Sequence, residues 1–284
     1  MWFRLSILTI FMIPILVSYS DTSTDFDCST VVDVPTSECE ALVSFYNSTF
    51  PIRMWNGSAN WLITNTVCNW YGITCTNGHV TEINLHSNNI EGFIPPEIGN
   101  LTELISLDLG ATGYTANLLY NIPIEIGNLT KLEILNMTGG IYRWAYPTLP
   151  VEIENLVNLQ TLELGNGNLA GQIPDLSNMT QLEYLNLYDN RLTGSIPEAL
   201  GNLFLLKFIA VGKNNLAGSL PISLTNLSQL YNFNWQPNLL LCEPSASDFQ
   251  EWLEVFRGTQ TKVICDGTRF LPFMVKEQKF LNTP

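Results

Sequence analysis

The side chains best suited to catalysis are few in this 284-residue chain. A Ser-His-Asp or Cys-His arrangement would have to use one of the only two histidines, His79 and His86. Neither histidine is accompanied by a nucleophile elbow, a phosphate-binding loop or a cluster of metal ligands. Asp108 and Glu163 could imitate the acid pair of a glycosidase, but they fall two strands apart in the predicted sheet. That separation is about 10 Å, which is beyond the range of such a pair. The sequence therefore predicts no enzyme, no cofactor and no metal site.

Cysteine is the second residue type with chemistry to offer, and its six copies lie towards the two ends of the chain. A segment at 1–20, with Arg4 followed by the apolar run Leu5–Val17, is typical of a secretory signal peptide. An uncleaved anchor is the alternative, but the run is short of the ~20 residues that span a bilayer. Behind a secretory signal, cysteines are expected to form disulfides. Neighbours in sequence suggest the pairs Cys28–Cys39, Cys68–Cys75 and Cys242–Cys265. The pairing among the first four stays open, and a zinc site is disfavoured by the spacing and the shortage of histidine.

The middle of the chain is built on a repeated frame of about 24 residues. Each copy contains two apolar residues separated by one position, a pattern that places both on one face of a strand. The cleanest copy runs from Met179 to Asn202, with the apolar pair Leu185 and Leu187 and a turn asparagine, Asn190. The first residues of the seven pairs are Ile83, Leu107, Leu135, Leu162, Leu185, Ile209 and Phe233. Periods of this size predict a solenoid, in which stacked coils share one continuous core.

The repeat resembles the leucine-rich repeat in its plant-type form, which carries a Gly-x-Ile-Pro signature. That signature is found at Gly92–Pro95, Gly171–Pro174, Gly194–Pro197 and, with leucine, at Gly218–Pro221. The resemblance implies an α/β solenoid: a curved, right-handed coil of about seven repeats with a parallel β-sheet on its concave side. It also implies a binding role, such as ligand sensing beside a receptor or inhibition of a foreign cell-wall enzyme.

Caps are expected at both ends, because the terminal coils of a solenoid expose an apolar face. The stretch Trp70–Cys75 resembles the N-terminal cap of plant-type leucine-rich repeat proteins. Ser37 and Ser247 each begin a capping-box pattern, which predicts a helix start. The resulting division is a signal peptide at 1–20, an N-terminal cap at 21–78, repeats at 79–241, a disulfide-stapled C-terminal cap at 242–266 and a tail at 267–284.

A formal net charge of −14 excludes nucleic acid as a natural partner, since binding to phosphates requires a basic surface. Solubility outside the cell is the simpler explanation of the charge, and a cationic partner is the alternative.

The solvent-facing positions of the predicted strands form a polar, mildly acidic candidate surface. It carries a cluster of aromatic side chains at Tyr184, Tyr188 and Phe208, a type favoured as binding anchors. The candidate ligand-binding residues on this face are Glu82, His86, Asp108, Glu163, Tyr184, Asn186, Tyr188 and Phe208. The alternative is that these side chains bind nothing, because every position of a sheet must carry some side chain.

The repeats depart from their own pattern in one stretch. The turn asparagine of Asn88 and Asn190 is replaced by Thr112, Gly140 and Gly167 in three consecutive repeats. Two of these repeats carry insertions, 110–120 and 138–147, which we expect to emerge side by side at one edge of the sheet. Residue types enriched in interface hot spots occur there, namely Tyr114, Tyr120, Tyr142, Arg143, Trp144 and Tyr146. The alternative is that the two loops only pack on each other.

Together these features predict a secreted or cell-surface binding module that takes an extracellular protein or peptide on its concave face and inserted loops. A carbohydrate-binding surface protein is the second hypothesis and a hydrolase the third. No stable membrane span is expected once the signal is cleaved.

Overall fold

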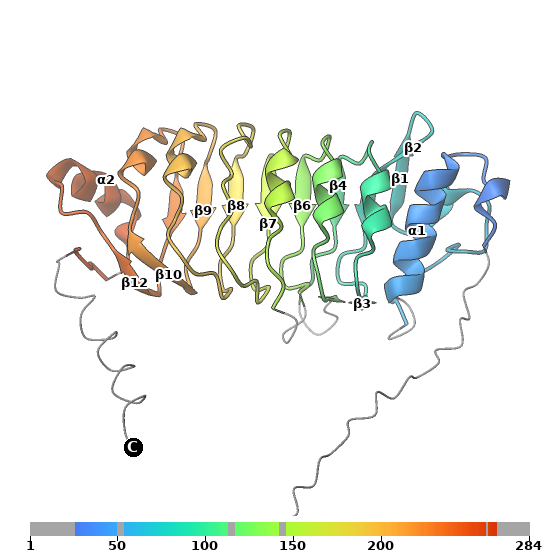
Figure 1. The fold of residues 1–284 in the computed structure, drawn as a ribbon, viewed down its shortest axis with the longest axis horizontal. Helices are drawn as coiled ribbons and strands as arrows, with labels where there is room; N and C mark the ends of the chain where they lie inside the picture. The colour runs from blue at the N-terminus through green and yellow to red at the C-terminus, as the bar shows by residue number, and fades with distance from the viewer. Residues whose placement is uncertain (1–25, 50–53, 113–116, 142–145, 260, 266–284) are drawn as a thin grey trace, which may run out of the picture.

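The computed structural model describes residues 26–49, 54–112, 117–141, 146–259 and 261–265, and it forms an elongated solenoid (Figure 1). One eight-stranded sheet runs along its length in the order β1-β2-β4-β6-β7-β8-β9-β11. The strand β1 (Ile73–Thr76) pairs antiparallel with β2 (His79–Asn84), and the others are parallel. The remaining strands of the sheet are β4 (Ser106–Asp108), β6 (Ile134–Asn136), β7 (Thr161–Glu163), β8 (Tyr184–Asn186), β9 (Phe208–Ala210) and β11 (Asn232–Asn234).

The seven strands from β2 onward are the seven apolar pairs predicted from the sequence. Leu107, Leu135, Leu162 and Leu185 stand in register, and each is fully buried. They belong to one core that extends from the N-terminal cap to Leu253. Because each coil buries its leucines against the next, the repeats are stable only as a stack.

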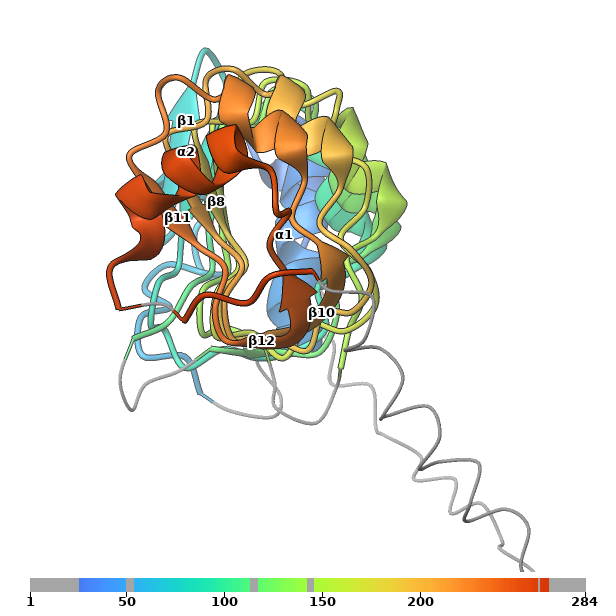
Figure 2. The same cartoon turned by 90° about the vertical axis from the view of Figure 1, so that its left-hand side faces the viewer.

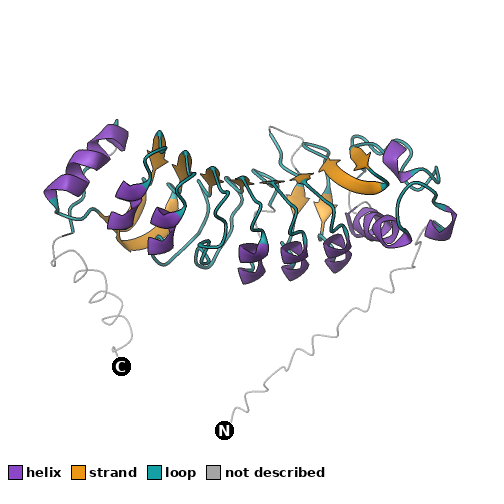
Figure 3. Cartoon of the chain, turned by 90° about the horizontal axis from the view of Figure 1, so that it is seen from above, coloured by secondary structure: helices purple, strands orange, loops and turns teal. Residues whose placement is uncertain are grey.

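Short 3-10 helices line the side opposite the sheet, which is the convex side of a gentle bend (Figures 2 and 3). Five of them begin directly after the proline that ends the Gly-x-Ile/Leu-Pro turn or its equivalent, where the fixed φ of proline suits the start of a helix. These helices are η3 (Pro96–Asn100), η4 (Ile124–Asn128), η5 (Val151–Asn155), η6 (Glu198–Asn202) and η7 (Ile222–Asn226). Two small parallel sheets close the coil below them, formed by β3 (Glu91–Gly92) with β5 (Leu118–Leu119) and by β10 (Asn214–Ser219) with β12 (Asn238–Cys242).

A row of buried asparagines holds the turns after the strands. The Asn190 amide donates to Leu164 O and Leu187 O at 2.9 and 3.0 Å, and its Oδ1 accepts from the N–H groups of Gly167 and Leu169. This is the role that the sequence predicts for the turn asparagine, since such backbone groups cannot stay unpaired when buried.

The prediction that the second repeat lacks this asparagine is wrong. Asn117, which is fully buried, donates to Leu85 O and Leu109 O and accepts from two N–H groups of the preceding repeat. The insertion carries the asparagine five positions beyond Thr112, and the fold returns it to the same place. In the third repeat Gly140 takes part through its backbone, donating its N–H to Met137 O at 3.0 Å.

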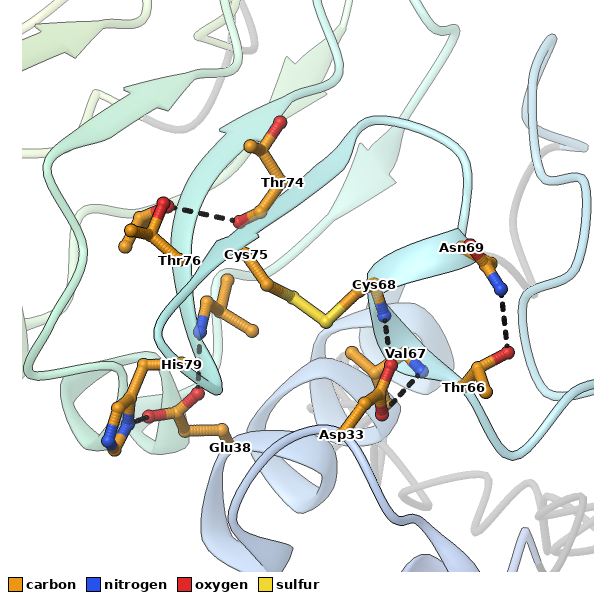
Figure 4. Close-up of a disulfide and its surroundings, with 12 residues drawn as sticks. Asp33, Glu38, Thr66, Val67, Cys68, Asn69, Thr74, Cys75, Thr76 and His79 are labelled. Carbon is orange, nitrogen blue, oxygen red and sulfur yellow. Dashed lines mark hydrogen bonds and ion pairs between the residues drawn. A yellow bond between two sulfur atoms is a disulfide. The ribbon is translucent and has the colours of Figure 1, made fainter.

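The N-terminal cap consists of η1 (Cys28–Thr30), α1 (Thr36–Thr49) and η2 (Val67–Asn69). The disulfides Cys28–Cys39 and Cys68–Cys75 form as suggested. Figure 4 shows the second, with the Asp33 carboxylate accepting from the N–H groups of Val67 and Cys68 beside it. The buried Glu38 ties α1 to β2 by accepting from Val80 N at 2.8 Å and contacting His79 Nδ1 at 2.7 Å. The tryptophans of this cap, Trp55, Trp61 and Trp70, pack on one another in its interior.

The C-terminal cap is α2 (Ser247–Arg257), which lies across the last coil (Figure 2). The Cys242–Cys265 disulfide joins the segments before and after this helix. The capping boxes are not formed as predicted. Ser247 is the first helical residue and Ala246 occupies the cap position, while α1 already begins at Thr36. The side chain of Gln250 instead donates to Glu243 and to Pro244 O, so that it secures the segment between β12 and α2.

Candidate functional site

The concave face of the sheet presents a continuous row of polar side chains. Asp108 is central: its Oδ1 accepts from Gly110 N, from Asn136 Nδ2 and from His86 Nδ1, at 2.9, 3.0 and 3.0 Å. Two strands further on, Glu163 accepts from Asn186 Nδ2 at 2.8 Å. The side chains of His86 and Asp108 remain 33% and 25% exposed, so they can still meet a ligand. The structure therefore brings four predicted residues into one polar row, namely His86, Asp108, Glu163 and Asn186. Glu82 lies exposed at the end of this row, on β2.

An aromatic cluster follows the polar row towards the C-terminal end of the sheet. The rings of Tyr184 and Phe208 stack with centroids 5.9 Å apart. Tyr231 joins them, since its hydroxyl lies 2.8 Å from that of Tyr184. This hydrogen bond raises the pKa of Tyr231. We name Tyr184, Phe208 and Tyr231 the aromatic trio.

Tyr231 is a residue that sequence reasoning missed. It lies immediately before β11, one position outside the predicted solvent-facing strand positions, and it is 61% exposed. The signal that could have found it is its position two residues before the apolar pair. In other repeats this position holds Glu133, Glu183 and Lys207, which are also partly exposed.

Tyr188 lies apart from the trio, at the edge of the sheet. Its ring is 5.0 Å from Lys213 Nζ, which also pairs with Asp189 at 3.3 Å. Hydrogen bonding to Tyr188 and then to Asp189 raises the pKa of Lys213. The Lys213 ammonium group therefore contacts both the Tyr188 ring and the Asp189 carboxylate.

Only the ends of the two inserted loops belong to the described residues. Tyr114, Tyr142, Arg143 and Trp144 lie outside the described residues. The bases of the two loops are adjacent, because Ala111 N donates to Thr138 O at 2.7 Å and Leu119 N donates to Gly140 O at 2.8 Å.

The two described loop aromatics have local partners. Tyr120 donates to Glu91 Oε1 and packs against Phe93, away from the concave face. The exposed Tyr146 lies beneath the Arg191 guanidinium, 4.5 Å from its ring centroid. Tyr120 thus lies beside the small β3–β5 sheet, whereas Tyr146 lies beside Arg191.

No catalytic constellation can be assembled from the described part of the chain. Each histidine contacts a carboxylate, and neither bonds a Ser, Thr or Cys side chain among the described residues. The same residues contain no group of three or more His, Cys, Asp or Glu side chains arranged for a metal ion. Asp108 and Glu163 are separated by the intervening strand β6, with Asn136 between them in register. Nor is any helix of the described residues long and apolar enough to cross a bilayer.

Two family profiles match the sequence. Leucine Rich Repeat matches residues 79–101 and 181–203, and Leucine rich repeat N-terminal domain matches residues 35–76. The chain is 33% identical over 154 residues to the LRR receptor-like serine/threonine-protein kinase GSO2 of Arabidopsis thaliana. That alignment covers 54% of this chain and 8% of the receptor kinase, so the chain corresponds to a small part of that relative.

Solved structures give the same relationship. The LRR ectodomain of the plant membrane receptor kinase GASSHO1/SCHENGEN3 from Arabidopsis thaliana, in complex with CASPARIAN STRIP INTEGRITY FACTOR 2, superposes with a TM-score of 0.57 at 27% identity. This match covers 73% of this chain and 27% of that one. Pollen Receptor Kinase 3 superposes with a TM-score of 0.59 at 25% identity, covering 73% of this chain and 98% of the other. The profiles, the sequence relative and the ectodomain structures agree with the repeat geometry: the chain carries leucine-rich repeats behind a leucine-rich repeat N-terminal domain and is similar to the ectodomains of plant receptor kinases.

Proposed function

We propose that the chain is a secreted, non-catalytic binding module that takes a protein or peptide partner on the concave face of its sheet and on its inserted loops. The fold is that of plant receptor ectodomains, and the GASSHO1/SCHENGEN3 ectodomain was solved in complex with CASPARIAN STRIP INTEGRITY FACTOR 2. The three disulfides are those expected of a protein that works outside the cell.

The aromatic trio is the observation that carries this proposal. Its residues come from strands β8 and β9 and from the position immediately before β11, and the backbones of these strands are fixed by the parallel sheet. Tyrosine and phenylalanine on a rigid support offer a large contact area at little cost in conformational entropy. Tyr231 is 61% exposed, so the trio is open to a partner although its members contact one another.

The test is a selection of binders from a displayed random-peptide library, followed by affinity measurements on variants. The double variant Tyr184→Ala with Phe208→Ala should weaken the selected binders by at least about tenfold, as expected for aromatic anchors. Phe204→Ala is the matched control, because this exposed aromatic lies outside the strands of the sheet. A library that yields no binder, or binders equally affected by both changes, would refute the proposal.

The loop part of the proposal has its own test. Replacing Tyr142, Arg143 and Trp144 together by serine should leave the melting temperature unchanged and weaken the same binders. Unchanged affinity in this variant would restrict the site to the sheet.

A further inference from the structure

On the concave face, the kind of residue at the central strand position recurs every two repeats, although the strands themselves recur every repeat. Asparagine occupies the central position of every second strand, at Asn84, Asn136, Asn186 and Asn234. The strands between carry Asp108, Glu163 and Ala210 there, each followed two residues later by a glycine, namely Gly110, Gly165 and Gly212. The face is therefore built from paired repeats.

Hydrogen bonds explain the pairing. The Asn136 amide lies over Gly110, where an added Cβ would come within 2.8 Å of it, and donates to Asp108 at 3.0 Å. Its Oδ1 accepts from Thr138 N at 3.0 Å. Asn186 repeats the arrangement over Gly165, donating to Glu163 at 2.8 Å and accepting from Tyr188 N at 3.0 Å.

The two carboxylates, one period apart, consequently share one kind of contact. Each has one oxygen fixed by the asparagine of the next strand. For the other oxygen, Asp108 Oδ2 or Glu163 Oε1, no partner is found among the described residues. Adjacent strands lie about 4.8 Å apart, so the period is about 9.6 Å. A partner can thus place one cation on each carboxylate if its cations have this spacing.

The third of the strands between the asparagine strands, β9, carries no acid at its central position. Ala210 stands where an acid would be, and it is flanked by Phe208 of the aromatic trio, with Tyr184 on the neighbouring strand. Along the sheet the face therefore offers an acidic position, a second acidic position and an apolar one, at equal intervals.

We propose that the partner is an extended cationic peptide in the polyproline II conformation. It carries Arg or Lys at two positions three residues apart and an apolar side chain three residues further on. Polyproline II has three residues per turn and a rise of about 3.1 Å, so every third side chain returns to the same face after about 9.3 Å. A β-strand repeats its face after about 6.7 Å and an α-helical turn advances about 5.4 Å, neither of which matches the period. The charge of −14 on the chain favours a cationic partner as well.

This inference rests on the proposed function, and synthetic peptides test it directly. The probes are fluorescein-labelled Arg-Pro-Pro-Arg-Pro-Pro-Leu and the same sequence reversed, measured by fluorescence polarisation at low salt. The control has the same composition with the arginines two residues apart, Arg-Pro-Arg-Pro-Pro-Pro-Leu, and is also made in both directions. We expect the better direction of the spaced probe to bind at least about tenfold more tightly than either control, because only the spaced probe can reach both carboxylates.

Variants of the protein locate the contact. Asp108→Asn and Glu163→Gln keep the shape of each side chain and should each weaken the spaced probe by about threefold to tenfold. Glu251→Gln removes an exposed acid from α2, away from the sheet, and should leave the affinity unchanged. Circular dichroism melts establish that all three variants are folded.

Equal binding of the spaced and control peptides, absence of binding by any of them, or indifference to Asp108→Asn and Glu163→Gln would overturn the inference. The proposed function is separable from it. If library binders depend on Tyr184 and Phe208 but lack the three-residue spacing of cations, the inference fails and the proposed function stands. If the library yields no binder on this face, both fail.

Discussion

Replacement of Asn117 by alanine is the sharpest test of how the insertion of the second repeat is accommodated. The Asn117 side chain is fully buried and makes hydrogen bonds to five backbone groups, at 2.9–3.2 Å. One of these, Gly110 O, also accepts from Ser87 N and keeps a partner. Four groups therefore lose the partner that the structure gives them, namely Leu85 O, Leu109 O, Asn88 N and Ile90 N.

The expected loss of stability follows from that count. A buried backbone group left unpaired costs about 1–3 kcal/mol, and relaxation together with entry of water reduces the sum. Taking the lower value for each of four groups, we expect Asn117→Ala to lower the free energy of unfolding by about 4 kcal/mol. This would be a large fraction of the stability of a typical domain.

Urea denaturation followed by far-UV circular dichroism gives the measurement. The m-value must be compared as well, because a solenoid weakened in one coil can stop unfolding as a single unit. Thr112→Ala is the control, since Thr112 occupies the sequence position of the asparagine but is exposed. It should cost less than about 0.5 kcal/mol, as is usual for surface substitutions. If Asn117→Ala costs under about 1 kcal/mol, or Thr112→Ala costs as much, Asn117 does not hold the turn as argued.

Two further changes probe the cap and the concave face. Arg257→Met should destabilise the protein by about 3–5 kcal/mol in urea denaturation, because it strands the fully buried Glu243 carboxylate that Arg257 binds with two nitrogens; a loss below about 1 kcal/mol would contradict this. Gly165→Ala should cost about 1–2 kcal/mol, because the added Cβ would come within 2.9 Å of Asn186 Oδ1. The same change made in an Asn186→Ala background should be nearly neutral, and equal costs in the two backgrounds would show that the glycine does not serve the asparagine.

Much of the fold could be predicted from the sequence because it depends on short-range periodicity. The pair Leu185 and Leu187 specifies a strand with one buried face, and the turn after it must supply partners for buried backbone groups, as Asn190 does. Asn117 could not be found in this way. An insertion shifts residues along the chain, and only the path of the backbone shows that position 117 returns to the place of Asn190.

The candidate site was predictable to the same extent. Tyr184 and Phe208 occupy predicted solvent-facing strand positions and do stack, whereas Tyr231 lies one residue before its strand and reaches across a neighbouring repeat. The contact of Tyr120 with Phe93 depends on pairing between β3 and β5, which no local pattern announces. Side chains that meet across repeats are therefore the part that sequence alone leaves undetermined.

The period of two repeats bears on where recognition can evolve on this surface. An asparagine that reaches back over a glycine fixes three positions in two neighbouring strands: the asparagine, the glycine and the acceptor that stands before it. Because the central asparagine already fills every second strand, a carboxylate held in this way is available only in the strands between. Duplication of a single repeat would place two strands of the same kind side by side and interrupt the alternation at that point. The alternation is kept when the face is lengthened in steps of two repeats, about 9.6 Å, and such steps would keep a partner with a repeat near that length in register.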